Sequence, residues 1–362
     1  MNEILNKLLH DYNIGNRQLR NHFVMAPVPS GMVENKIIQN SIVDFYDSRS
    51  KDPSLVIIGA INVDSDTATN HAKIPYIRSN QDIQTWLMVN QKIHNNGAVS
   101  LAEIWHSGSS RAFSDYSDTY ITPTKRHFGH NDHEMDIAYI QKIIDKFVLA
   151  GQKAKLSGFD GVDIHAAHGS FLHDFFFRDT NQRSDKYGYD TGTTIINEIV
   201  DRIKNEVGDD FIVGIRISNY RMYDLKSHLR STEQELSDFL NTFSNRIDIF
   251  DVSNLHWRDT ATENSKILFS KFVKHVTGKP VITVGQIGFG NNFYQDLPII
   301  LKKISDDPNQ SLLDMQHEKS HFNNSNYLYQ DYLNESFDMV AVGRPLLVNP
   351  HWISELEGNS DK

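Results

Sequence analysis

The stretch Gly158-Phe-Asp-Gly-Val-Asp-Ile-His-Ala-Ala-His-Gly169 joins a short apolar run to two histidines. Within it, Gly161–His165 has the length and the branched apolar residues of a buried strand. Helix-length segments lie on both sides, Ile140–Leu156 before it and Ile195–Val207 after it, and each carries apolar residues at a helical period. This alternation of strand and helix predicts a parallel sheet.

The same alternation extends along the whole chain. Eight runs are candidate strands: Phe23–Met25, Leu55–Ala60, Val99–Ile104, Gly161–His165, Phe211–Ile217, Asp248–Val252, Pro280–Val284 and Met339–Val342. Eight strand–helix units favour a closed (β/α)8 TIM barrel of the α/β class over an open doubly wound sheet. An open sheet would call for a glycine-rich phosphate turn after the first strand, where the chain has Ala-Pro-Val-Pro-Ser-Gly instead.

One connection is longer than a single barrel helix requires. About fifty residues separate Val284 from Met339, whereas most connections in compact domains are far shorter. We therefore expect one barrel domain over residues 1–362, with an insertion at 286–338 between strands seven and eight. The insertion is interpreted as a solvated excursion, with a lid or a partner-binding segment as the alternative.

Composition excludes several classes of function. The 36 Lys and Arg against 46 Asp and Glu give a formal net charge of −10, which argues against binding to nucleic acid or anionic membranes. The chain has no cysteine, so disulfides, thiolate zinc sites, thiol nucleophiles and cysteine-ligated iron–sulfur clusters are excluded. No apolar run approaches a membrane span, and Met1 to Tyr12 lacks a secretory pattern, so we expect a cytoplasmic protein with a small-molecule substrate.

The histidines of the opening stretch are the first candidate site. His165 closes a predicted strand and His168 follows in the turn, so both imidazoles can project into the bowl at the carboxyl ends of the barrel strands. Two neutral imidazoles can present N–H donors to one oxygen. Two alternatives stay open: a zinc site that includes Asp163, which shares strand parity with His165, and a purely structural pair.

An arginine and two glycines are further candidates. Arg216 lies in an otherwise apolar strand, and a permanent charge there needs an anionic partner, either a ligand or an acidic strand residue. Gly285 and the pair Gly343-Arg344 follow strands seven and eight, where barrels commonly bind phosphate.

The residues of 158–169, with Asn181-Gln-Arg-Ser-Asp-Lys-Tyr-Gly188, resemble the signature region of the Old Yellow Enzyme family. Further matching segments are Arg20-Asn-His-Phe-Val-Met-Ala-Pro27, Trp105-His-Ser-Gly108, Gly214-Ile-Arg-Ile-Ser218, Val284-Gly285 and Gly343-Arg-Pro345. The His-x-x-His spacing is similar to that of the bacterial branch of this family.

The resemblance implies an enzyme that binds FMN and takes a hydride from NADH or NADPH. It also implies that the hydride passes to a small electron-poor acceptor such as an enone, a quinone or a nitro compound. His165 and His168 would bind the oxygen of the acceptor, while Arg216 would face the N1 and O2 edge of the flavin. Gly285, Gly343 and Arg344 would hold the FMN phosphate, and Pro27 and Ala60 would also contact the cofactor. The resemblance implies no resident metal, and it makes a homo-oligomer possible.

Three positions depart from the family pattern. Ser170 stands where the family has a tyrosine that protonates the substrate, so it is the candidate third catalytic residue, with a far weaker acid than a phenol. Pro29 stands where a threonine or cysteine contacts flavin O4, and proline offers no donor. Glu103 replaces a glutamine that faces flavin N3 and O2. These departures leave open a specialised relative with an unusual acceptor, or a retired flavin-binding scaffold.

Overall fold

Eight parallel strands close into one barrel in the computed structural model, which describes residues 2–63, 68–113, 120–124, 132–288 and 325–358. The strand order around the barrel is β10-β11-β12-β13-β14-β3-β6-β7. Their bounds are β3 (Phe23–Met25), β6 (Leu55–Asn62), β7 (Val99–Trp105), β10 (Gly161–His168), β11 (Ile212–Arg221), β12 (Ile249–Ser253), β13 (Val281–Val284) and β14 (Met339–Val342). The predicted TIM barrel is therefore confirmed, and each predicted strand run overlaps one of these eight strands.

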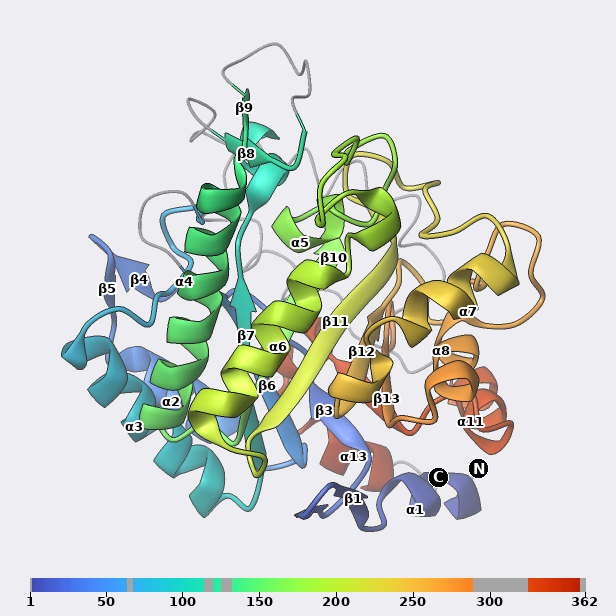
Figure 1. The fold of residues 1–362 in the computed structure, drawn as a ribbon. Coiled ribbons are helices and arrows are strands. Elements are labelled where there is room, and N and C mark those ends of the chain that lie inside the picture. The colour runs from blue at the N-terminus through green and yellow to red at the C-terminus, as the bar shows by residue number, and fades with distance from the viewer. Residues whose placement is uncertain (1, 64–67, 114–119, 125–131, 289–324, 359–362) are drawn as a thin grey trace.

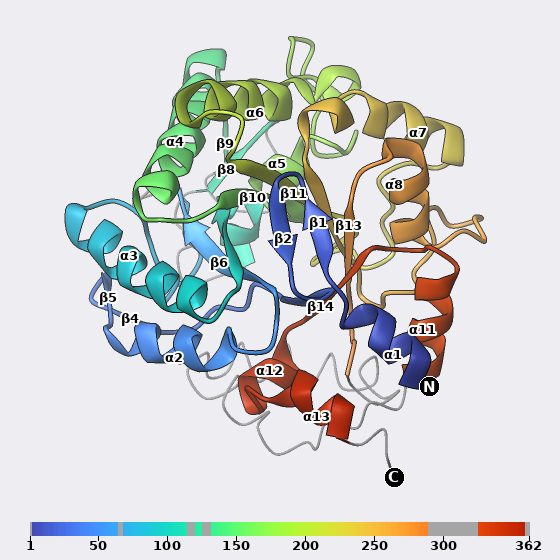
Figure 2. The same ribbon diagram turned by 90° about the horizontal axis from the view of Figure 1, so that it is seen from below.

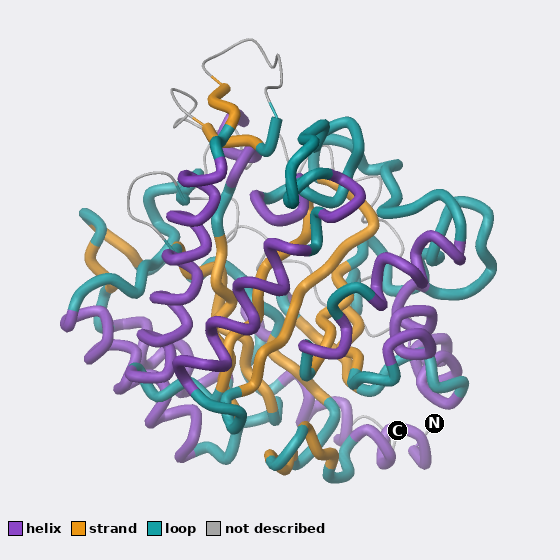
Figure 3. Tube along the Cα trace, viewed as in Figure 1, coloured by secondary structure: helices purple, strands orange, loops and turns teal. Residues whose placement is uncertain are grey.

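Helices surround the barrel on its outer side, as Figure 1 and Figure 3 show. They are α2 (Ser41–Arg49), α3 (Asn80–Asn95), α4 (Ile137–Leu156), α6 (Thr194–Val207), α7 (Glu233–Asn241), α8 (Phe269–Thr277), α11 (Ser325–Leu333), α12 (Arg344–Val348) and α13 (Trp352–Gly358). Local sequence motifs account for two of their starts. Ser79 with Asp82 and Thr232 with Glu235 form capping boxes that begin α3 and α7.

The remaining elements of the described chain are short. They are α1 (Asn2–Leu8), β1 (Tyr12–Ile14), β2 (Arg17–Leu19), β4 (Val33–Glu34), β5 (Ile37–Ile38), η1 (Gly108–Phe113), β8 (Tyr120–Thr122), β9 (Asp132–Glu134), α5 (Phe171–Asp174), η2 (Tyr189–Thr191) and η3 (Ser244–Arg246). The β1–β2 hairpin lies across the amino-terminal end of the barrel in the view from below (Figure 2). Ile14 and Leu19 are buried there in one cluster with Leu55 and Leu101, so this end of the barrel is closed by apolar packing.

The strand β10 differs from its prediction at one end. The expected strand stops at His165, but the ladder to β11 continues to His168, which pairs with Arg221 after a register shift between Ala166 and His168. His168 has a φ of 60°, in the left-handed region that few residues other than glycine adopt. The second histidine therefore belongs to an irregular strand end and not to the following turn.

The predicted insertion at 286–338 falls largely outside the described residues, because 289–324 are not described. The described part of this range contains α11, which packs against α1. A helix thus connects β13 to β14 as in the other barrel units. In the described part of the chain, no helix is both long enough and apolar enough to cross a membrane.

Candidate active site

The two predicted histidines lie together at the carboxyl end of β10. Their ring centroids are 5.3 Å apart, and the ring planes meet at 66°. His165 is buried and His168 is partly buried. The edge of Trp105, at the end of the neighbouring strand β7, lies against His165 with ring centroids 6.3 Å apart. The barrel thus brings the imidazole pair to the end where barrel enzymes carry their chemistry.

Both imidazoles are held neutral. Burial, together with the positive charge of Arg216, lowers the pKa of His165 to about 3. Burial also lowers the pKa of His168 well below its usual value, and the neighbouring His165 and Arg216 add to the effect. A neutral imidazole carries one N–H donor and one acceptor nitrogen, so the pair can donate to an oxygen but cannot serve as an acid reservoir near pH 7.

Serine hydroxyls fix the orientation of these rings. Nδ1 of His165 lies 3.0 Å from Oγ of Ser170, and Nε2 of His168 lies 2.9 Å from Oγ of Ser253. The backbone N–H of His168 donates to Oγ of Ser218 at 2.9 Å. Ser170 is therefore brought into the site as predicted, although its hydroxyl is engaged by His165. Ser218 and Ser253 were missed by the sequence analysis.

The zinc alternative receives no support from the geometry. In the described ranges, no group of three or more His, Cys, Asp or Glu side chains is arranged to hold a metal ion. Asp163, the third ligand that this alternative needs, is instead part of a charged layer beneath the histidines.

This charged layer lies inside the barrel, above the apolar layer that contains Leu101 and Ile249. It consists of four buried side chains from four adjacent strands, namely Glu103, Asp163, Arg216 and Asp251. Nη1 of Arg216 is 2.8 Å from Oε1 of Glu103, and Nε of Arg216 is 3.2 Å from Oδ2 of Asp251. The sequence left open whether Arg216 pairs with a ligand or with an acidic strand residue. The structure supplies two acidic strand partners, Glu103 and Asp251.

Three acids around one arginine cannot all be ionised without cost. Burial raises the pKa of Glu103, although Arg216 opposes the shift. Burial raises the pKa of Asp251 to about 6, and burial with the charge of Asp251 raises that of Asp163. For Arg216, burial disfavours the charge, but the three carboxylates outweigh it and raise the pKa further. The layer therefore holds a fixed guanidinium among carboxyl groups whose pKa values lie above their usual range.

A glycine makes room for the unusual glutamate. A Cβ atom at Gly59 would overlap the carboxylate and the Cβ of Glu103, so the backbone of β6 packs directly on this side chain. Ala60, the next residue of β6 and a predicted cofactor contact, is partly exposed. Asp251 could have been found from the sequence by the signal that singled out Arg216, a charge within an apolar strand.

The predicted phosphate-binding residues also lie at this end of the barrel. Gly285 and Gly343 directly follow β13 and β14, which pair side by side. Arg344 is the first residue of α12 and is partly buried. Next to Gly285, Asn254 follows β12, and both polar atoms of its buried carboxamide lack a hydrogen bond. An orphaned amide of this kind offers a donor and an acceptor to a ligand or water.

The segment after β3 carries the last two predicted cofactor contacts. Pro27 is partly buried, and Pro29 is exposed. Neither proline has a backbone N–H, so the backbone offers no donor at these two positions.

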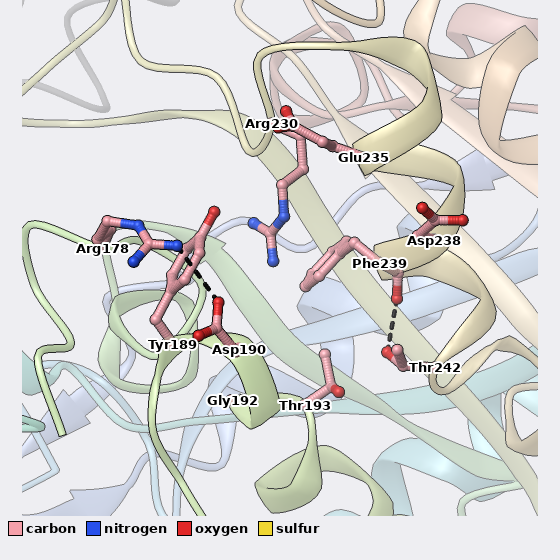
Figure 4. Close-up of a pocket in the computed structure, with 10 residues that line it drawn as sticks. All are labelled: Arg178, Tyr189, Asp190, Gly192, Thr193, Arg230, Glu235, Asp238, Phe239 and Thr242. Carbon is pink, nitrogen blue, oxygen red and sulfur yellow. Dashed lines mark hydrogen bonds and ion pairs between the residues drawn. The ribbon is translucent and has the colours of Figure 1, made fainter. Parts of the chain in front are cut away.

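A second hollow lies away from this site. It has a volume of about 290 Å³ and is lined by charged and aromatic residues that include Arg178, Tyr189, Arg230 and Phe239 (Figure 4). The guanidinium of Arg230 lies over both aromatic rings, at 4.8 Å from the centroid of Tyr189 and 4.2 Å from that of Phe239. None of the predicted site residues lines this hollow.

The fold and the site define an α/β-barrel protein whose polar site lies at the carboxyl ends of its strands. A family model described as the NADH:flavin oxidoreductase / NADH oxidase family matches residues 7–294. The chain therefore belongs to this family of flavin enzymes, and the predicted resemblance to Old Yellow Enzymes is confirmed.

Curated relatives match part of the chain. A putative 12-oxophytodienoate reductase 4 of Oryza sativa subsp. japonica is 31% identical over 228 residues, which cover 60% of each protein. An NADH oxidase of Thermoanaerobacter brockii is 27% identical over 294 residues, 77% of this chain and 45% of that protein. The matches thus span less than two thirds of these relatives. The bacterial branch stays a prediction.

Solved structures share the fold over nearly the whole chain. An Old Yellow Enzyme homologue from Zymomonas mobilis is 19% identical with a TM-score of 0.74 and covers 98% of this chain and 93% of its own. Morphinone reductase in complex with tetrahydroNAD gives the same TM-score and identity, with 98% and 91% covered.

Proposed function

We propose that this protein is an FMN-dependent NAD(P)H oxidoreductase that reduces a small electron-poor acceptor. The observation that carries the proposal is the pair of neutral imidazoles, His165 and His168, at the carboxyl end of β10 in a chain of this family. Two neutral rings can donate to the oxygen of an acceptor and stabilise the negative charge that develops there as a hydride arrives.

The residues present fit FMN in several respects. Arg216 keeps a permanent charge at a fixed position, which suits the edge of a flavin where negative charge accumulates on reduction. Gly285, Gly343 and Arg344 lie together on adjacent strand ends, where a phosphate group would be held. The orphaned carboxamide of Asn254 supplies further hydrogen-bonding capacity beside Gly285. Bound FMN would accept a hydride from NADH or NADPH and transfer it to the acceptor.

The departures shape the expected activity without removing it. Glu103 partly neutralises the charge of Arg216. A reduced cofactor would therefore meet less positive charge than it would if a glutamine stood at position 103. Acceptors that need no proton on carbon, such as quinones or nitro compounds, depend less on the phenol that Ser170 replaces. The specialised relative therefore remains the second candidate function, favoured by the pairing of Glu103 with Arg216.

A direct experiment tests the proposal. The purified protein should show the visible absorption of a flavin, with one FMN released per chain on denaturation. Anaerobic NADH or NADPH should then bleach this absorption, and addition of an enone or a quinone should restore it. A protein without flavin would contradict the proposal, and a flavin that neither coenzyme reduces would favour the retired scaffold. A homo-oligomer and a cytoplasmic location stay predictions from the sequence.

A further inference from the structure

The hydroxyl of Ser170 is poorly placed to replace the missing phenol. Ser170 is 3% exposed, and its Oγ lies 3.0 Å from Nδ1 of His165. A serine hydroxyl is also a much weaker acid than a phenol. Its contact with His165 orients that ring, so the proton that completes alkene reduction needs another source.

A phenol stands on the neighbouring strand. Successive residues of a strand alternate between its two faces, so Arg216, Ser218 and Tyr220 of β11 share one face. Arg216 belongs to the charged layer inside the barrel, and Ser218 accepts a hydrogen bond from the backbone of His168. Tyr220 is the next residue of this series toward the mouth, and it is partly buried.

The ring of Tyr220 packs directly on the acceptor-binding histidine. Its centroid lies 5.1 Å from that of His168, with the ring planes at 40°. The phenol ring is therefore beside His168, on a strand that also carries Arg216.

We propose that Tyr220 donates the proton that completes reduction of an electron-poor alkene in this site. The inference rests on the proposed function and assigns a catalytic residue to it. The hydride, which comes from NAD(P)H through the cofactor, forms a C–H bond at the β-carbon, and the electron pair of the C=C bond moves to an oxyanion held by His165 and His168. The O–H bond of Tyr220 then breaks as its proton bonds to the α-carbon, and the phenolate takes a proton from water.

The test separates the two half-reactions in Tyr220→Phe. FMN content and the rate of flavin reduction by NAD(P)H should equal those of the wild type. Reoxidation by 2-cyclohexenone should slow by about 10²- to 10⁴-fold, because that is the usual contribution of a general acid. Reoxidation by 1,4-benzoquinone should be nearly unchanged, because no carbon is protonated. Tyr139→Phe, on α4, is the matched control and should behave as the wild type in all three measurements.

A measurement without turnover gives a second readout. In protein labelled at the tyrosine ring carbons, the resonance that Tyr220→Phe removes should shift when the wild type binds 4-hydroxybenzaldehyde. Tyr220→His, which keeps a proton donor, should recover part of the enone rate. Equal enone rates in Tyr220→Phe and the wild type, with normal flavin reduction, would contradict the role of Tyr220 but not the proposed function. A Tyr220 resonance that does not shift when the ligand binds would also contradict the role of Tyr220. A wild type that binds no flavin would instead overturn the proposed function.

Discussion

Oε1 of Glu103 lies 2.8 Å from Nη1 of Arg216 inside the barrel, although 113 residues separate them in the chain. This contact pairs a carboxylate, at the position where the family resemblance implies a glutamine, with the guanidinium of the charged layer beneath the histidine pair. The charge that Arg216 offers to a ligand therefore depends on the protonation of Glu103 and of its neighbours Asp163 and Asp251.

Replacing Glu103 by glutamine should make the bound flavin easier to reduce. The amide keeps the shape of the side chain but removes the negative charge, while Asp251 still pairs with Arg216 at 3.2 Å. The midpoint potential should rise by tens of mV, since about 30 mV corresponds to 1.4 kcal/mol for a two-electron couple. Spectroelectrochemistry checks this, with Glu198→Gln on α6 as the control. A potential that does not change would show that Glu103 does not act on the cofactor.

Stability should fall in acid because buried neutral histidines resist protonation. Burial lowers the pKa of His173 to about 3, and its Nδ1 accepts a hydrogen bond from Gly169 while Nε2 contacts the carbonyl of Ser218. Below about pH 6.5 this histidine binds a proton in the unfolded chain but not in the folded state. The free energy of unfolding therefore falls by up to about 1.4 kcal/mol per unit of decreasing pH for each such group. The loss continues down to about pH 3.

Acids with raised pKa values act in the opposite direction. Asp251 holds its proton in the folded state up to about pH 6, so its contribution to stability is lost as the pH rises from about 4 to 6. The two effects partly cancel in that window.

Urea unfolding between pH 4 and 8 checks the role of the histidine. The free energy of unfolding of His173→Gln should fall less steeply toward acid pH than that of the wild type, whereas His351→Gln, at an exposed position, should follow the wild type. Parallel acid limbs in all three proteins would contradict this explanation.

Changing His165 and His168 to alanine together should abolish acceptor binding but not cofactor binding. In the wild type, 4-hydroxybenzaldehyde should perturb the visible spectrum of the flavin, because the two imidazoles hold its phenolate oxygen. The double variant should retain one FMN per chain and show no perturbation. His94→Ala, at an exposed surface position, is the control. One zinc per chain in the wild type, lost in the double variant, would return the pair to the metal alternative.

Arg344→Ala should weaken FMN retention. A hydrogen bond to a charged group contributes about 1.5–3 kcal/mol, so the dissociation constant should rise by roughly 10- to 100-fold if Arg344 binds the phosphate. Fluorescence titration of the apoprotein with FMN measures the change, and riboflavin, which lacks the phosphate, should bind both proteins equally. Arg246→Ala on the surface is the control. An unchanged affinity for FMN would show that Arg344 does not bind the phosphate.

The sequence alone determined the barrel and the end at which its site lies. Short branched apolar runs alternating with helical periods are typical of strand–helix units in a parallel sheet, and eight such units favour closure into the barrel that the structure shows. Because parallel strands share one carboxyl end, His165, Arg216, Gly285 and Gly343 had to meet there. These conclusions need only local periodicity and strand direction, which one chain displays directly.

The tertiary structure alone decided which side chains touch. Glu103 and Asp251 reach Arg216 because β7, β11 and β12 are brought to one level by the barrel register, and no spacing in the chain encodes that level. His168 stayed on β10, against expectation, because pairing with Arg221 of β11 extends the ladder beyond the apolar run. Tyr220 came beside His168 for the same reason. Contacts across strands depend on register and closure, and these are properties of the assembled barrel that a local pattern does not contain.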